Sequence, residues 1–189
     1  DIEIGCGGSI LTLAQMHPGL RVHWVVLSSD AVRGPEAKRS ADRFLENAGS
    51  REVILKVFRN SFFPYEGGAI KEFFEETLKR LTPDLIFTHT RQDLHQDHRL
   101  VSELTWNTWR NHLILEYEIP KYDGDFGAPN AFSQVPAALL ERVAALRRGG
   151  AEPVGFGEGF AAYREVLAGR LAPLVAGPGT PGAPAVARL

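Results

Sequence analysis

The chain has 189 residues, of which 44% are hydrophobic and 23% are charged, enough apolar residues for the core of one sizeable domain. Its formal net charge is −2 with both signs interspersed, so we expect no nucleic-acid or anionic-membrane surface. The single cysteine, Cys6, excludes an internal disulfide and fits a reducing compartment. No apolar run approaches the roughly 18 residues of a membrane span, so we expect a soluble, cytoplasmic protein.

Two hydrophobic periodicities alternate along the chain. Continuous apolar runs typical of buried parallel strands alternate with segments of helical spacing. The predicted strands are 21–27, 53–58, 84–88 and 113–119, and the predicted helices are 10–14, 35–48, 70–81, 99–110, 136–148 and 158–171. This order predicts an α/β fold, specifically a Rossmann-like three-layer α/β/α arrangement with a mostly parallel sheet.

The two ends of the chain differ in character. A glycine-rich segment, 5–9, precedes the first predicted helix. A loop of this kind normally follows a strand, so we expect the first strand of the sheet to lie upstream of Asp1. The segment 172–189 is rich in Ala, Gly and Pro and has no periodicity, which predicts a mobile tail. We therefore expect one domain over 1–171 and a tail over 172–189.

The candidate chemistry lies just after the predicted strand 84–88. His95 and His98 are three residues apart, so both can project from one side of a turn or an opening helix. Asp97 between them is close enough to hydrogen-bond an imidazole and fix its tautomer. One histidine can bind a metal while the other, held protonated, stabilises an oxyanion. The plainer alternative is a helix N-terminus with both imidazoles in solvent.

The spacing also leaves this site incomplete. A catalytic zinc site usually has three protein ligands and an open position, so another Asp, Glu or His must come from elsewhere in the chain. His89, at the end of the strand, is near enough to support the site but is more typical of a satisfied loop histidine. Cys6 is interpreted as a small packed side chain rather than a nucleophile.

Two motifs in order resemble the PIG-L superfamily, also called LmbE-like N-deacetylases. Residues 1–9, Asp-Ile-Glu-Ile-Gly-Cys-Gly-Gly-Ser, are similar to the family's segment that follows His-Pro-Asp. Residues 95–98 match its His-x-Asp-His motif. Residues 33–36 are similar to its Arg-x-x-Glu segment, and 155–160 to a C-terminal Gly-x-x-Glu-x-Phe pattern. The resemblance spans roughly residues 1 to 165.

The resemblance implies a role for each matching residue. It implies that Asp1 and His98 bind one zinc ion per chain. His95 would stabilise the oxyanion or protonate the leaving amine, Asp97 would orient His95, and Arg33 would contact substrate. An ordinary surface pair between Arg33 and Glu36 remains an alternative at that position. The family's third ligand, three residues before Asp1, and its general base, just before Asp1, would lie upstream of the printed sequence.

The expected function is therefore hydrolytic removal of an N-acetyl group from an amino sugar or related glycoconjugate by zinc-activated water. One alternative is a methyltransferase that uses S-adenosylmethionine, because residues 3–9 also resemble a Gly-x-Gly-x-Gly loop, although Ser9 takes the place of the third glycine. Another is a catalytically inactive, sugar-binding member of the deacetylase family. The identity of the substrate and the oligomeric state stay open.

Overall fold

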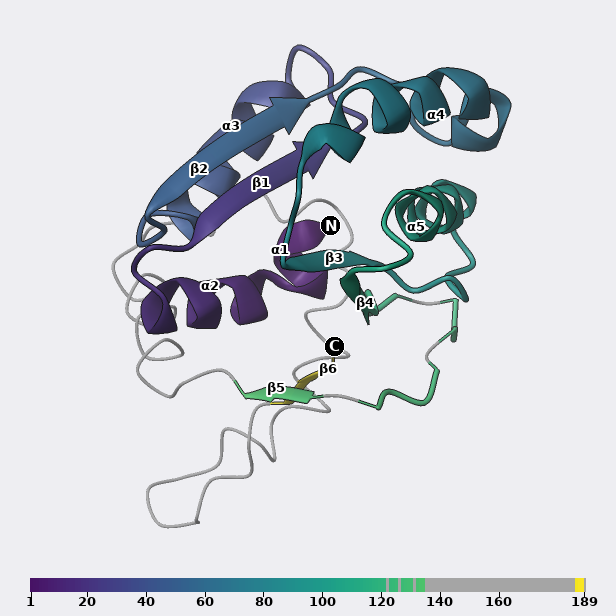
Figure 1. Cartoon of the computed structure of the whole chain (residues 1–189). Coiled ribbons are helices and arrows are strands. Elements are labelled where there is room, and N and C mark those ends of the chain that lie inside the picture. The colour runs from purple at the N-terminus through teal and green to yellow at the C-terminus, as the bar shows by residue number, and fades with distance from the viewer. Residues whose placement is uncertain (122, 126, 131, 135–185, 189) are drawn as a thin grey trace.

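The computed structural model describes residues 1–121, 123–125, 127–130, 132–134 and 186–188. Two pairs of parallel strands carry the fold (Figure 1). In the first pair, β1 (Arg21–Val26) runs beside β2 (Ser50–Leu55), with Arg21 opposite Ser50. In the second pair, β3 (Leu85–His89) runs beside β4 (Leu113–Tyr117), with His89 opposite Tyr117. The mixed α/β class with parallel strands is thus confirmed.

Helices and strands alternate along the chain from α2 to β4, as predicted. The helices are α1 (Ile2–Gly5), α2 (Gly7–Met16), α3 (Arg33–Phe44), α4 (Gly67–Glu76) and α5 (Gln96–Thr108), with short 3-10 turns η1 (Phe63–Tyr65) and η2 (Leu78–Arg80). No helix within the described ranges combines the length and apolarity needed to span a membrane. The alternation of strand and helix agrees with the periodicity of the sequence.

The structure differs from the prediction in the glycine-rich segment, and several other expectations stay predictions. Residues 2–5 and 7–16 are helical, so the glycine-rich segment is not the open loop expected for it. The described strands form three separate hydrogen-bonded pairs, so the three-layer arrangement around one sheet stays a prediction. Within the predicted tail, β6 (Val186–Arg188) pairs antiparallel with β5 (Phe132–Gln134). The predicted helices 136–148 and 158–171 lie outside the described residues.

Alternate residues of the strands enter two hydrophobic clusters. On β1, Trp24 lies in a cluster with Cys6, Leu45 and Tyr117, while its neighbour Val25 contacts the cluster around Ile70 and Trp109. Successive side chains of a strand point to opposite faces, so β1 is covered on both faces. This burial explains why its sequence is a continuous apolar run rather than an alternating one.

A close contact between Gly5 and Tyr117 positions the start of the chain. A Cβ atom added at Gly5 would overlap the ring of Tyr117 on β4. The missing side chain therefore lets α1 lie directly against β4. Ser40 of α3 holds α1 from another side, since its Oγ donates to Glu3 Oε1 over 2.7 Å. These contacts place Asp1, the N-cap of α1, close to His89 at the end of β3.

We predict that Gly5→Ala destabilises the fold, whereas Gly68→Ala does not. The added methyl group of the first variant overlaps a buried ring, and overpacking of this kind costs about 1 to 3 kcal/mol. An added Cβ at the exposed Gly68 in α4 meets no atom within 4 Å, so its alanine should be neutral or stabilising by at most about 1 kcal/mol. Urea unfolding of both variants measures the difference. Equal stability of the two would contradict the proposed packing of α1 on Tyr117.

We also predict that Cys6 is unreactive in the folded chain. Its side chain is 1% exposed, and burial raises the pKa of its thiol to about 12. At pH 8 only about one thiol in ten thousand is then ionised, and the thiolate is the reactive form. A thiol reagent should therefore modify the chain quickly in urea and very slowly in buffer. Fast, stoichiometric modification of the folded protein would disprove this prediction.

Candidate metal and catalytic site

Parallel strands bring the candidate residues together, because their carboxyl ends lie at the same edge of a sheet. His89 is the last residue of β3, and the loop that follows leads into α5, whose N-cap is His95. His98 lies in the first turn of α5. Asp1 comes from α1, 97 residues earlier in the chain.

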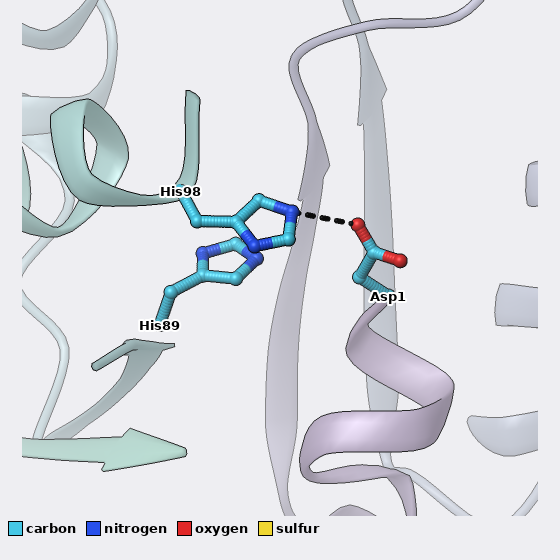
Figure 2. Close-up of side chains that lie close together, drawn as sticks. All are labelled: Asp1, His89 and His98. Carbon is cyan, nitrogen blue, oxygen red and sulfur yellow. Dashed lines mark hydrogen bonds and ion pairs between the residues drawn. The ribbon is translucent and has the colours of Figure 1, made fainter. Parts of the chain in front are cut away.

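Asp1 and His98 are in direct contact. His98 Nε2 lies 3.0 Å from Asp1 Oδ2, and Figure 2 shows the carboxylate directed at the ring nitrogen. His89 lies beside them, its ring stacked on that of His98 with 4.2 Å between centroids. One ligand atom from each of these three residues falls within 4.8 Å of the others. The three form the candidate metal group of the described residues.

The electrostatics of His98 suit a cation at this point. Burial lowers the pKa of His98 below its ordinary value, although the hydrogen bond to Asp93 opposes the shift. A neutral imidazole has one N–H, and His98 Nδ1 faces the buried carboxylate of Asp93 at 2.9 Å. The proton therefore belongs on Nδ1, which leaves the Nε2 lone pair facing the oxygen of Asp1. Two lone pairs that converge in this way fit a metal ion bound between them.

The sequence favoured an ordinary loop histidine at His89, whereas the structure stacks its ring on His98 and leaves one ring nitrogen without a partner among the described residues. His89 is the residue opposite Tyr117 in the β3 and β4 register, and its Nε2 lies 3.2 Å from the Tyr117 hydroxyl. Its Nδ1 is buried and has no hydrogen-bond partner among the described residues. Burial, followed by the neighbouring His98, lowers the pKa of His89 well below its ordinary value. A neutral imidazole with an unpartnered buried nitrogen is a suitable metal ligand.

His95 lies beside the candidate metal group, and its neutral form is favoured. Its Nδ1 accepts the backbone N–H of Asp97 at 3.3 Å, so the proton of the neutral ring lies on Nε2. Its ring stacks on that of His98 with 4.3 Å between centroids. Burial, and next the neighbouring His98, lowers the pKa of His95. The protonated imidazole expected from the sequence is therefore not the favoured form here.

Asp97 contacts a different partner from the one expected. Its carboxylate accepts the backbone N–H groups of Ser61 at 2.5 Å and of Phe63 at 3.1 Å, and its side chain is almost fully buried. It thus fixes the loop after β2 against the start of α5 and does not hold the His95 ring through its carboxylate. Ser61 has a φ of 65°, which is uncommon for a residue with a side chain. The Asp97 hydrogen bond stabilises this turn.

Arg33 lies exposed at the start of α3. Its backbone N–H donates to Asp30 Oδ1 over 2.7 Å. Within the described part of the chain, its side chain makes no hydrogen bond or ion pair with Asp1, His95 or His98. The structure therefore does not join Arg33 to the other candidate residues, and its contact with substrate stays a prediction.

Sequence reasoning missed a buried carboxylate, Asp93. It is 1% exposed and lies between His98 and Lys121, whose Nζ is 2.6 Å from Asp93 Oδ1. Lys121 also contacts Asp125. Residues that follow β4 therefore contact the loop that carries Asp93. The available signal was the sequence Asp93-Leu94-His95, because an aspartate often accepts the N–H two residues later, and this bond is present at 2.7 Å.

Comparison with known proteins identifies the family of this chain. A family model described as PIG-L, GlcNAc-PI de-N-acetylase, matches residues 1–109, which is more than half of the chain. The chain therefore belongs to the PIG-L family, as its two motifs predicted. The matched range includes every predicted site residue. A search of curated proteins found no match.

Several solved structures share the fold. The N,N′-diacetylchitobiose deacetylase from Pyrococcus horikoshii is 18% identical with a TM-score of 0.58, over 93% of this chain and 76% of that one. A deacetylase of the teicoplanin biosynthesis pathway is 14% identical with a TM-score of 0.60, over 91% and 89%. GalB, the 4-carboxy-2-hydroxymuconate hydratase from Pseudomonas putida KT2440, is 16% identical with a TM-score of 0.62, over 98% and 90%. The fold thus accommodates two reaction types, so the reaction must be argued from the site.

We predict that Asp97→Ala destabilises the protein by about 2 to 4 kcal/mol, because the buried N–H of Phe63 and the partly buried N–H of Ser61 lose their acceptor. Asp97→Asn keeps one acceptor oxygen and should lose about half as much. The matched control is Asp84→Ala, at an exposed aspartate, which should change stability by less than about 0.5 kcal/mol. Urea unfolding gives the three values. A loss at residue 97 no greater than that of the control would contradict the role of Asp97 in holding the loop.

Proposed function

We propose that this chain is the catalytic part of a zinc-dependent N-deacetylase acting on an N-acetylated amino sugar or related glycoconjugate. Membership of the PIG-L family supports a deacetylase. The observation that carries the metal assignment is the 3.0 Å distance between Asp1 Oδ2 and His98 Nε2. Both atoms are acceptors, and a cation bound between them would remove their repulsion. The names of the structural neighbours, which include a diacetylchitobiose deacetylase, suggest the substrate class.

Asp1 and His98 would hold the metal. Among the described residues His89 is the third side chain able to bind it, whereas the family resemblance assigns the third ligand to a histidine three residues before Asp1. When bound, zinc supplies an acidified water and polarises the acyl carbonyl. The Nε2–H of neutral His95 is the donor available to the developing oxyanion. The proton that the general base takes from the water would pass to the leaving amine. Asp97 would hold the loop at Ser61 against the start of α5, next to His95 and His98.

The general base is a separate question. The two buried carboxylates near the cluster are already engaged, Asp93 by His98 and Lys121, and Asp97 by two backbone N–H groups. Neither is free to take a proton from water. The family resemblance instead assigns the base to an aspartate immediately before Asp1. We therefore expect full activity from a chain extended upstream.

We predict that His98→Ala and Asp1→Asn each weaken zinc binding by at least about 100-fold and abolish acetate release from N,N′-diacetylchitobiose or an N-acetylglucosamine conjugate. His17→Ala is the control, because it removes an exposed histidine on the turn after α2. Calorimetric titration of the metal-free protein with zinc measures binding, and an acetate assay measures turnover. Both are run on the printed chain and on a chain extended upstream.

Unchanged zinc affinity in His98→Ala and Asp1→Asn would contradict the metal assignment. Equal turnover by the printed and the extended chain would contradict the placement of the base upstream of Asp1. Binding of the sugar without acetate release by the extended chain would favour the inactive, sugar-binding alternative. The methyltransferase alternative has lost its structural basis, because the glycine-rich segment is helical and lies within the family match.

A further inference from the structure

Asp93 is a buried carboxylate beside the site, and no step proposed above uses it. Its side chain is 1% exposed, and its carboxylate contacts three nitrogen atoms. Oδ2 faces His98 Nδ1 at 2.9 Å, while Oδ1 accepts the backbone N–H of His95 at 2.7 Å and the Nζ of Lys121 at 2.6 Å. A buried charge with this many partners has a fixed orientation.

Further hydrogen bonds fix the residues around Asp93. Lys121 Nζ donates to Asp125 Oδ2 over 2.5 Å, and the backbone N–H of Leu94 donates to the same oxygen over 2.7 Å. Arg99 donates to the backbone carbonyl of Asp93 over 2.9 Å. The loop between β3 and α5 is thus tied to α5 and to the segment after β4. These contacts orient the Asp93 carboxylate so that Oδ2 points toward the ring of His98.

We propose that Asp93 is a positioning residue that fixes the tautomer and the ring orientation of His98. Because the carboxylate can only accept, it keeps the proton on Nδ1 and turns the Nε2 lone pair toward Asp1. Lys121 supports it by holding the second oxygen. Asp93 acts through His98 and does not itself touch substrate. The consequence for metal binding rests on the proposed function, whereas the tautomer does not.

The sharpest test is Asp93→Asn, a variant of almost the same shape. The amide has one acceptor oxygen, and two donors, His95 N–H and Lys121 Nζ, already occupy the Oδ1 side. The amide oxygen should take that side, so that its NH₂ group faces His98 Nδ1. His98 must then accept on Nδ1 and carry its proton on Nε2, the nitrogen that faces Asp1.

Nitrogen NMR of the metal-free protein at pH 8 reads the tautomer, because protonated and unprotonated ring nitrogens have well separated ¹⁵N shifts. We expect the Nδ1–H form of His98 in the wild type and the Nε2–H form in Asp93→Asn. Asp123→Asn is the matched control, because Asp123 belongs to the same charged cluster but is 49% exposed and lies 3.8 Å from Lys121. The control should keep the wild-type tautomer.

Zinc titration of the same samples gives the second measurement. We expect Asp93→Asn to bind zinc 10- to 100-fold more weakly and Asp123→Asn to bind it as the wild type does. A His98 that keeps Nδ1–H in Asp93→Asn overturns the inference, whatever the zinc affinity. Should this variant fail to fold, an Nε2–H tautomer in the wild type overturns it equally. A reversed tautomer with unchanged zinc affinity supports the positioning role and contradicts the ligand role of His98.

Discussion

The structure around the candidate site depends on the contact between Asp1 and His98, 97 residues apart in sequence. Neither residue reaches this point by local structure alone. Asp1 arrives because Gly5 lets α1 lie against Tyr117, and His98 arrives because the parallel strand β3 ends at the same edge. The contact joins two acceptor atoms, which is unfavourable without a proton or a cation between them. This unfavourable contact is the physical reason for assigning a metal here.

Two buried carboxylates near this contact, Asp93 and Asp97, have different structural roles. Asp93 faces the imidazole of His98, the proposed metal ligand, whereas Asp97 accepts two backbone N–H groups and supports the loop at Ser61. The two look equivalent in the sequence, as acids beside histidines. Their partners separate them, since a carboxylate that accepts backbone N–H groups orders the chain, and one that accepts an imidazole N–H orders a ligand.

Much of the fold was predictable because hydrophobic periodicity is a local property. The runs 21–27 and 84–88 indicated buried strands, and both strands are present. The meeting of Asp1 with His98 followed from a family resemblance, not from spacing. The contacts that escaped prediction are those between distant loops, such as Lys121 with Asp93, 28 residues apart, and Asp97 with Ser61, 36 residues apart. No periodicity encodes them, because they depend on how the strand ends are placed in space.

The most direct measurement is anomalous diffraction at the zinc edge from crystals grown with zinc. The proposed metal site predicts a single strong peak about 2.0 to 2.2 Å from both Asp1 Oδ2 and His98 Nε2. A map with no peak between these two residues, or with zinc bound only elsewhere on the chain, would contradict it.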